Sequence, residues 1–573
     1  MRRCLTSVSL FFITILALSS YAQEPTWSRL IDSDKEPQNW MSYGGNYKAW
    51  RYSALDQITK NNVKNLVPVW VFQTGELRGG LNSTPIVMDG VMYLMGPMNR
   101  IFAINAATGE IIWRYFYKLP GTSINYQRGT RGLSIGYGMV YFGTLDNHVV
   151  ALDMKTGREV WDVEVEDTRQ CGCNITSPPL IVKDKVIAGG TGGEHAHRGY
   201  LNAFDAKTGK HLWRFYTIPG PGEPGFETWS EKMWKYGGAP AWLTGSYDPE
   251  LNLLYWGVGN PSSDFYGEDR KGDNLYSNSI IALDPDTGKL KWYYQEIPHD
   301  LYDFDSAYEC VLIDIERDGR KQKLLVHPNK GGMTWVLDRE TGKYLNSFPH
   351  VDIINWHNGV DKNGKPQGLL PVPPNGQTFA CPSIAGGRNY DHSAYSPRTQ
   401  LWYNIGWEFC NIIRPVKQEI KEGRDLFGGG VEFKPPKDTP AYGHIDAYDP
   451  LTGVRKWRHR TKYANLSSLL VTGSDLIFSG DVEGNAFALD AKTGDKLWSF
   501  NTGGGMSGSP ISYAVNGRQY IAVPTGMGSL AAEIIPIIWP ESAAKLPQAA
   551  STLFVFALPE AVNNTKGATG NGK

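Results

Sequence analysis

One phrase recurs seven times along the chain and restricts its fold more than any other feature. The shared pattern is A-x-D-x-x-T-G-x-x-x-W, found at 103–113, 151–161, 203–213, 282–292, 336–346, 447–457 and 488–498. A short strand brings the Asp, the Thr-Gly pair turns the chain where Gly can take a positive φ, and a second strand delivers the Trp. The phrase therefore predicts repeated antiparallel strand pairs whose Asp and Trp residues are structural.

The segments around this phrase predict more strands and a closed ring of sheets. Apolar stretches such as 138–153 and 474–490 are typical of further antiparallel strands. Several short strands per repeat indicate a β-propeller, which has about four strands in each blade. Residues 66–76 resemble the closing strand of one more blade, and 552–560 would supply its partner. We therefore predict an all-β, eight-bladed propeller in which each Trp docks on the neighbouring blade.

The repeats predict a single propeller domain over residues 23–573. The intervals between phrases range from 41 residues (447 to 488) to 111 residues (336 to 447), so long insertions interrupt the ring. The longest, about 347–440, is rich in Pro, Gly and Asn, and we expect it to cover one face and carry function. We expect a flexible tail at about 561–573.

The N-terminus has the pattern of an export signal. Arg2 and Arg3 precede the apolar run 10–18, and Ser20-Tyr21-Ala22 has the small-x-small form of a cleavage site. The apolar run is shorter than the ~20 residues that a membrane span needs. We therefore predict a signal peptide at 1–22, a mature chain in the periplasm, and no membrane span.

Charge and cysteine content exclude some functions. The net charge is −1 with no basic stripe, which gives no indication of nucleic-acid binding. Cys4 lies in the predicted signal, and an oxidising compartment permits disulfides among Cys171, Cys173, Cys310, Cys381 and Cys410. Cys381 could close a loop with Cys410, while Cys171 and Cys173 would form a small ring or pair elsewhere. No CxxCH motif occurs, so a redox enzyme of this sequence would pass its electrons to another molecule.

The segment PHDLYDFDS, residues 298–306, places three acids beside two aromatic rings. Carboxylates this close repel one another when buried, which indicates a cation between them. Alternate side chains of an extended segment point the same way, so Asp303 and Asp305 can face one ion while Phe304 faces away. We interpret Asp300 as a solvated or capping acid.

The repeated phrase in an export-targeted chain resembles the quinoprotein alcohol dehydrogenases, propellers that hold pyrroloquinoline quinone (PQQ) and a metal ion at their centre. The likeness extends from residues 40–75 to residues 520–529. The family's metal and base segments are similar to residues 189–199, 257–261 and 298–306 of this chain. Together with the acidic segment, the resemblance implies Asp303 as the base and Glu194, Asn260, Asp303 and Asp305 as metal ligands. It also implies cofactor contacts by Arg131, Thr176, Thr191, Gly192, Gly193, Trp242 and Lys330.

The residue types in this set meet the demands of PQQ, a flat ring with three carboxylates and an ortho-quinone. Trp242 offers a planar surface for stacking, and Arg131 offers a bidentate fork for a carboxylate. Glu194 and Asn260 offer the oxygen ligands that a hard cation takes. The ion polarises a quinone carbonyl so that its carbon accepts hydride. Asp303 is placed to remove the alcohol proton.

The resemblance also bears on the metal. Calcium-dependent members of the family commonly have a small residue at the position of Asp305, whereas members that use lanthanides have an acid there. Carboxylates from Glu194, Asp303 and Asp305 together favour a trivalent ion. We expect a lanthanide, with calcium as the alternative.

The predicted function is that of an exported PQQ-dependent alcohol dehydrogenase, which oxidises an alcohol to an aldehyde or ketone. Its electrons would pass to a separate acceptor of the cytochrome c kind. One alternative is a PQQ-dependent dehydrogenase of sugars or bulky secondary alcohols. An alternative of another class is a non-catalytic propeller that serves as a scaffold. Whether the chain forms a homodimer stays open.

Overall fold

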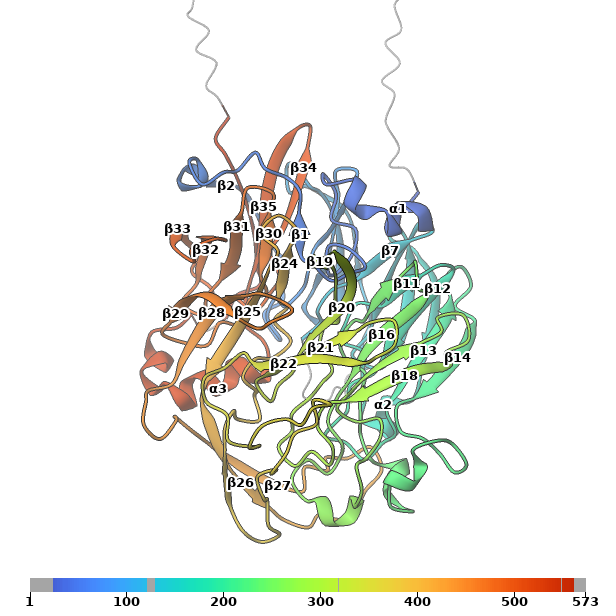
Figure 1. The fold of residues 1–573 in the computed structure, drawn as a ribbon. Helices are drawn as coiled ribbons and strands as arrows, with labels where there is room; N and C mark the ends of the chain where they lie inside the picture. The colour runs from blue at the N-terminus through green and yellow to red at the C-terminus, as the bar shows by residue number, and fades with distance from the viewer. Residues whose placement is uncertain (1–23, 121–128, 318, 548, 561–573) are drawn as a thin grey trace, which may run out of the picture.

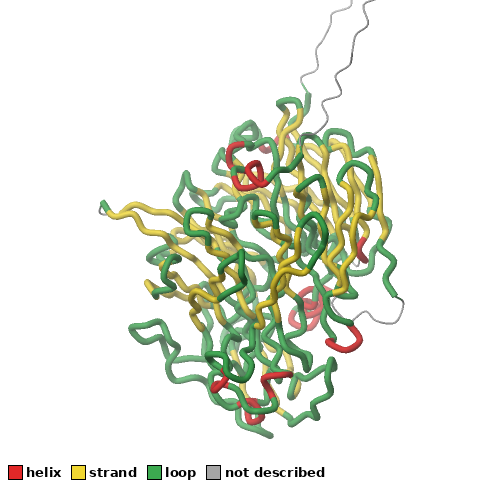
Figure 2. Tube along the Cα trace, turned by 90° about the vertical axis from the view of Figure 1, so that its right-hand side faces the viewer, coloured by secondary structure: helices red, strands yellow, loops and turns green. Residues whose placement is uncertain are grey.

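The computed structural model describes residues 24–120, 129–317, 319–547 and 549–560. The predicted signal peptide (1–22) and the predicted tail (561–573) lie outside these residues. Within them the chain is built mainly of antiparallel strands, with short helices and with loops gathered at the lower end of the view in Figure 2. The all-β prediction is confirmed.

Five sheets each take four strands that are consecutive in the chain and hydrogen-bonded in that order. They are β3–β6 (Ile86–Met88, Val91–Gly96, Arg100–Asn105, Ile111–Phe116), β7–β10 (Ser134–Gly136, Met139–Gly143, His148–Asp153, Glu159–Glu164), β11–β14 (Leu180–Val182, Lys185–Gly189, Tyr200–Asp205, His211–Tyr216), β15–β18 (Ser246–Asp248, Leu253–Val258, Ser279–Leu283, Leu290–Gln295) and β19–β22 (Val311–Arg317, Arg320–Pro328, Met333–Asp338, Tyr344–Pro349). In Figure 1 the green strands β11–β18 lie on the right-hand side and the orange strands β28 and β29 on the left.

Three further sheets complete the set of four-stranded units. They are β24, β25, β28 and β29 (Ala394–Ser396, Leu401–Glu408, Tyr442–Tyr448, Arg455–Thr461), then β30–β33 (Leu470–Thr472, Leu476–Gly480, Asn485–Asp490, Lys496–Asn501) with β1 (Tyr52–Ser53) added at the edge, and last β34–β36 (Ile511–Val515, Arg518–Thr525, Thr552–Ala557) with β2 (Val67–Gln73). Strand β2 pairs antiparallel with β36, Val67 opposite Ala557. Strands from the two ends of the chain therefore share one sheet.

The tryptophan of a phrase lies against the Thr-Gly turn of the next phrase. Trp113 Nε1 donates a hydrogen bond to the main-chain oxygen of Met154 (3.1 Å), and a Cβ added at Gly157 would come within 2.5 Å of the indole ring. The same hydrogen bond joins Trp70 to Ala106, Trp161 to Ala206, Trp213 to Pro285 and Trp457 to Ala491. Each turn glycine thus leaves room for the ring of the preceding sheet.

The phrase that ends in Asn346 instead of Trp keeps both contacts with two residues. Asn346 Nδ2 donates to the main-chain oxygen of Leu451 (2.9 Å), in the turn of the next phrase. The ring of Phe348 covers Gly453, where an added Cβ would lie 2.2 Å from it. Asn346 therefore supplies the hydrogen bond and Phe348 supplies the apolar cover.

Substituting a turn glycine under a tryptophan is expected to destabilise the fold through the ring contact. Gly157 has φ +68°, so Gly157→Ala brings about 1–2 kcal/mol of left-handed backbone strain and about 1–3 kcal/mol of overpacking against Trp113. Gly222→Ala is the matched control, because Gly222 has φ +84° and nothing within 4 Å. Denaturant unfolding measures both changes. Equal losses of unfolding free energy would contradict the packing role.

The insertion over 347–440 contributes its own small sheet, made of β23, β26 and β27 (Thr378–Ala380, Cys410–Pro415, Gly429–Lys434). Strands β26 and β27 lie at the bottom of Figure 1. A disulfide joins Cys381 to Cys410, with their Cα atoms 4.5 Å apart. A second disulfide joins Cys171 to Cys173, which settles the open pairing, and Cys310 is a buried thiol.

The helices are short: α1 (Trp27–Ile31), α2 (Thr168–Cys171) and α3 (Leu530–Ile538). None of the helices in the described ranges combines the length and apolarity that a bilayer span requires. Helix α3 lies at the lower left of Figure 1, in the segment between β35 and β36.

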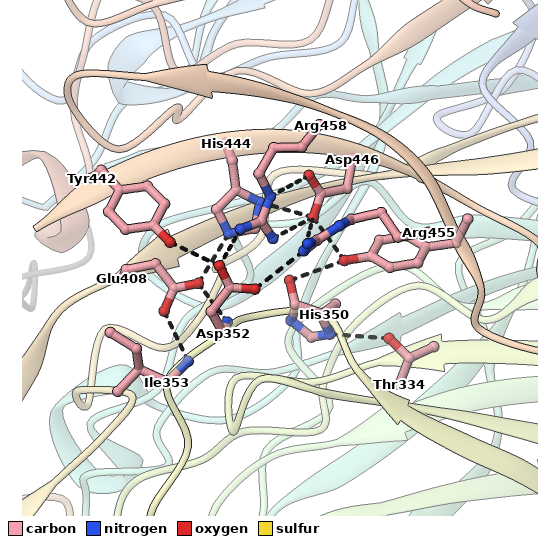
Figure 3. A network of polar contacts seen from close by, with 11 residues as sticks. Thr334, His350, Asp352, Ile353, Glu408, Tyr442, His444, Asp446, Arg455 and Arg458 are labelled. Carbon is pink, nitrogen blue, oxygen red and sulfur yellow. Dashed lines mark hydrogen bonds and ion pairs between the residues drawn. The ribbon is translucent and has the colours of Figure 1, made fainter. Parts of the chain in front are cut away.

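A polar network, buried at His444 and exposed at Asp352, fastens the start of the insertion to the sheet of β25, β28 and β29 (Figure 3). His444 lies between two acids, with Nε2 3.1 Å from Glu408 Oε1 and Nδ1 3.1 Å from Asp446 Oδ2. Asp352, from the insertion, accepts hydrogen bonds from Arg458 and Tyr442. Burial by itself lowers the pKa of His444, but Asp446 and Glu408 outweigh it and raise the pKa above its usual value.

The network gives a pH dependence whose sign follows from that shift. Because the folded-state pKa of His444 lies above the ordinary 6.5, its stabilising contribution is complete below pH 6.5 and is lost as pH rises through the folded-state pKa. The difference in unfolding free energy between wild type and His444→Gln should therefore shrink above pH 6.5. His459→Gln is a control of opposite sign, because burial lowers the pKa of His459. The contribution of neutral His459 to the free energy of unfolding is therefore lost as pH falls below 6.5. A difference for His444→Gln that does not change with pH would contradict this account.

Candidate active site

A cavity of about 820 Å³ brings most of the predicted site residues together. Nine of the eleven line it: Arg131, Thr191, Gly192, Gly193, Glu194, Trp242, Asp303, Asp305 and Lys330. The other two lie directly behind this wall. Thr176 accepts a hydrogen bond from the Arg131 guanidinium, and Asn260 Oδ1 would lie 2.2 Å from a Cβ added at Gly193. Residues from several sheets therefore converge on one space.

A lysine stands between the two acids that were expected to face an ion. Lys330 Nζ donates to Asp303 Oδ1 (2.9 Å) and to Asp305 Oδ2 (3.0 Å). Phe304 turns the other way and packs its ring against Trp356, with centroids 5.6 Å apart. The alternation of side chains along this segment is as predicted, and the cation that both acids face here is the ammonium of Lys330.

Asp300 is a capping acid, and the part of the prediction that allowed it to be solvated is wrong. It is fully buried, and its two carboxylate oxygens accept hydrogen bonds from the main-chain N–H groups of Tyr302 and Phe304, both at 2.8 Å. Burial raises the pKa of Asp300 above its usual value. Because its carboxylate closes the turn that leads into the acidic segment, Asp300 positions Asp303.

Asp305 connects Trp242, which forms the floor of the cavity, to Asn260, one of the predicted metal ligands. Its Oδ1 accepts a hydrogen bond from Trp242 Nε1 (3.1 Å) and one from the main-chain N–H of Asn260 (3.2 Å). A Cβ added at Gly259 would lie 2.3 Å from the same oxygen, so this approach requires a glycine. One carboxylate thereby fixes the orientation of the indole plane and the position of the Asn260 turn.

Oxygen atoms without partners lie beside this wall. Asn260 is fully buried, and its Nδ2 donates to Asp264 Oδ1 (3.0 Å). Asn260 Oδ1 and Asp264 Oδ2 accept no hydrogen bond from any described residue. Leaving a buried acceptor unpaired costs about 1–3 kcal/mol. Amide and carboxylate oxygens in this state fit a hard cation, which takes oxygen ligands.

The pKa of Asp303 is strongly shifted. Burial raises it well above its usual value, and Asp305 and Glu194 add to the shift while Lys330 opposes it. Asp303 also has φ +58°, a left-handed conformation that is uncommon for a non-glycine residue. The repulsion among these buried acids can be relieved by protons or by a bound cation.

An aromatic and cationic group lines the cavity next to these acids. The Arg131 guanidinium lies 4.8 Å from the Trp242 ring centroid and 4.4 Å from that of Tyr390. Burial lowers the pKa of Arg131 below its usual value. A flat ring with a fixed guanidinium beside it fits a planar, negatively charged ligand.

Two segments roof the cavity, and the sequence analysis had predicted one of them. Ile384, Asn389, Tyr390 and Phe427 come from the predicted insertion. Met527, Ser529, Ala532, Pro536 and Leu546 come from 526–551, between β35 and β36. The sequence signal for this second segment is Ser529 followed by an apolar run. The side chain of Ser529 caps α3 by accepting a hydrogen bond from the main-chain N–H of Ala532.

A buried ion pair supports the floor from below. Arg388 donates to both oxygens of Glu309 (2.9 and 3.1 Å), and Ser393 adds its N–H and hydroxyl to the same carboxylate. Tyr308 lies between this pair and the floor, its ring 5.8 Å from that of Trp242. Burial acts to raise the pKa of Glu309, but Arg388 prevails and lowers it to about 2.

Comparison with known proteins shows the family of the chain. Residues 40–353 and 436–521 match the family model of the PQQ glucose/ethanol/alcohol dehydrogenase β-propeller domain. The chain is 36% identical to quinoprotein alcohol dehydrogenase PedH of Pseudomonas putida, over 98% of both chains. It is 34% identical to the putative dehydrogenase XoxF of Paracoccus denitrificans, over 87% of this chain and 88% of that one.

Among solved structures, a europium-containing methanol dehydrogenase is similar to this fold with a TM-score of 0.87 and 33% identity, over 93% of this chain and 100% of that one. A quinohemoprotein alcohol dehydrogenase from Comamonas testosteroni is similar with a TM-score of 0.85 and 32% identity, over 91% of this chain and 82% of that one. The resemblance stated from the sequence is confirmed. The chain belongs to the PQQ-dependent, or quinoprotein, alcohol dehydrogenase family and is an oxidoreductase that acts on alcohols.

Proposed function

We propose that the chain oxidises an alcohol to an aldehyde or ketone in the cavity of about 820 Å³, with PQQ and one metal ion bound there. The observation that carries the proposal is the meeting of Glu194, Asp303, Asp305 and Lys330 in a single cavity with Trp242. A non-catalytic scaffold gains nothing from such a set, because buried acids of like charge destabilise a fold. We also propose that the seven four-stranded sheets and the sheet of β30–β33 with β1 are the eight blades of one propeller domain that starts at residue 23, with the phrase tryptophans as docking residues.

The residues of the cavity have separate tasks in this proposal. Glu194, Asn260, Asp303 and Asp305 would hold the ion. Trp242 would provide the stacking surface, while Arg131 and Lys330, with Thr176, Thr191, Gly192 and Gly193, would hold the cofactor. When bound, the cofactor supplies a hydride-accepting ortho-quinone and the ion supplies a Lewis acid.

Asp303 is the proposed general base, which takes the proton of the substrate hydroxyl. Its carboxylate must be ionised for this task, although burial and the neighbouring acids raise its pKa. The ammonium of Lys330, 2.9 Å from Asp303 Oδ1, favours the ionised form. A cation bound by the neighbouring carboxylates would act in the same direction.

We propose a lanthanide as the ion, with calcium as the alternative. Support comes from the acid at position 305, from the charge of Glu194, Asp303 and Asp305 around one cavity, and from the similarity to a europium-containing methanol dehydrogenase. With the ammonium of Lys330 counted, these three carboxylates leave two negative charges, and the carboxylates of the cofactor would add to them.

The roof of the cavity favours a second candidate substrate class, the bulky secondary alcohols and sugars. PQQ and the ion would occupy part of the cavity of about 820 Å³, and the roof residues would border the space that is left. Apolar roof residues, Ile384, Phe427 and Leu546, would suit a substrate larger than ethanol. We further propose export to the periplasm by residues 1–22, and a separate cytochrome c-like acceptor for the electrons.

Reconstitution tests this proposal. Purified apoprotein is loaded with PQQ and either Ca²⁺ or La³⁺, and reduction of an artificial dye is followed across primary, secondary and sugar alcohols. We expect turnover with PQQ and higher turnover with La³⁺. Undiminished activity with calcium alone would overturn the lanthanide assignment. Absence of dye reduction with PQQ and either ion would overturn the enzyme assignment for this cavity.

A further inference from the structure

We propose that Asp264 is a fourth carboxylate of the metal site, a residue that neither the sequence pattern nor the family resemblance singled out. The inference rests on the ion site of the proposed function and extends it. Asp264 follows the Asn260 turn by four positions and is 1% exposed. A buried acid needs a partner, and the contacts of Asp264 show which partners it has.

The Asp264 carboxylate orients the amide of Asn260. Its Oδ1 accepts a hydrogen bond from Asn260 Nδ2 (3.0 Å), which leaves Asn260 Oδ1 on the other side of the amide. That oxygen faces Gly193, where an added Cβ would lie 2.2 Å away, and Gly193 directly precedes Glu194. Asp264 thus turns the acceptor of Asn260 toward the loop that carries Glu194.

The second oxygen of Asp264 points to a ligand. Asp264 Oδ2 has no hydrogen-bond partner within the described part of the chain, and neither does Asn260 Oδ1. Asp303 and Glu194 are within electrostatic reach of this carboxylate, so it belongs to the same charged group. The two unpaired oxygens belong to buried side chains and lie near three further carboxylates. Such a set of oxygen ligands suits a hard cation.

Two cations, Lys330 and Arg270, lie within electrostatic reach of Asp264, but neither donates a hydrogen bond to its carboxylate. Lys330 donates to Asp303 and Asp305 at 2.9 and 3.0 Å. Arg270 is fully buried, and its guanidinium donates to the main-chain oxygen of Ser263 (3.1 and 2.9 Å) and to Asn274 Oδ1 (2.8 Å), not to the Asp264 carboxylate.

The charge balance of the cluster follows from these contacts. Five carboxylates, those of Glu194, Asp264, Asp300, Asp303 and Asp305, face two cations, Lys330 and Arg270, so three negative charges remain to be balanced. Burying uncompensated charge is strongly unfavourable, and a trivalent ion removes the whole deficit. A divalent ion leaves one charge over. Asp264 thereby adds to the preference of this site for a trivalent ion.

Terbium titration of the full-length apoprotein tests the inference without any turnover. Tb³⁺ emission, sensitised by tryptophan, reports binding, and Ca²⁺ competition gives the affinity for the divalent ion. We expect Asp264→Asn to weaken Tb³⁺ binding by about 10- to 100-fold, the usual effect of a residue that orients or supplements metal ligands. We expect a smaller loss for Ca²⁺. Asp264→Glu, which keeps the charge, should retain most of the Tb³⁺ affinity.

Asp273→Asn is the matched control, because Asp273 is exposed in the same segment of the chain. Thermal unfolding of apo Asp264→Asn should show no loss of stability, since the substitution removes a buried charge and keeps an acceptor for Asn260. Unchanged Tb³⁺ affinity in Asp264→Asn would overturn the role of Asp264 and leave the proposed ion site standing. If the wild type binds Ca²⁺ but not Tb³⁺, the trivalent site itself is overturned, and the inference falls with it.

Discussion

Asp303→Asn is expected to lower kcat by about 100- to 10,000-fold, the range that a positioned general base contributes. An amide at this position cannot accept the proton of the substrate hydroxyl. It keeps an oxygen for Lys330, whose ammonium lies 2.9 Å from Asp303 Oδ1. It also removes a buried negative charge from beside Asp305 and Glu194, so the folded protein should not lose stability.

The measurement is dye-linked turnover of protein loaded with PQQ and La³⁺, with bound cofactor determined by absorbance for each variant. Asp273→Asn, an exposed Asp→Asn change, should keep wild-type turnover and serves as the control. If Asp303→Asn holds cofactor and turns over within a few-fold of wild type, the base is another residue.

Arg388→Met is expected to lower the free energy of unfolding by about 3–5 kcal/mol, because it leaves Glu309 as an unpaired buried charge. Both residues are fully buried, and Arg388 donates to both oxygens of Glu309. Since Arg388 is what lowers the pKa of Glu309 to about 2, the ion pair stabilises the fold above the ordinary pKa of 4.5. That contribution is lost as pH falls from 4.5 toward 2, so the difference between wild type and variant should narrow there.

Denaturant unfolding of three further proteins sharpens this test. Arg169→Met removes an exposed ion pair with Asp167 and should leave stability unchanged. Glu309→Gln in the Arg388→Met background removes the unpaired charge and should restore part of the loss, and Glu309→Gln alone completes the double-mutant cycle. A loss in Arg388→Met no larger than in Arg169→Met would show that the buried pair does not support the floor of the cavity.

Much of the fold was predictable because its determinants are local and repeated. The glycine of the Thr-Gly turn has a positive φ, and the tryptophan four positions after it lies against the next turn, as Trp113 lies against Gly157. The pairing of β2 with β36 was readable from apolar runs at the two ends of the chain. Where Asn346 replaces the tryptophan, Asn346 still makes the hydrogen bond to the next turn and Phe348 supplies the ring that covers its glycine.

The candidate site was predictable as a set of residues and less so as a set of contacts. The position of Lys330 between Asp303 and Asp305 depends on how a strand end 25 residues later meets the acidic segment, which no local pattern reveals. Asp264 was missed for the same reason, since the carboxylates of Glu194 and Asp303 that act on it come from other segments of the chain. Asp300 was only half predicted, because the residues that contact it, Asn278 and Arg270, lie more than 20 positions earlier in the chain.

A crystal structure of the protein loaded with PQQ and La³⁺, with anomalous data for the ion, tests the central claim most directly. The account predicts a single lanthanum peak about 2.3–2.6 Å from oxygens of Glu194, Asn260 and Asp303, the range for large oxygen-bound cations, with the quinone stacked on Trp242 beside it. A loaded, active protein whose ion and ring lie elsewhere, with these side chains far apart, would contradict it.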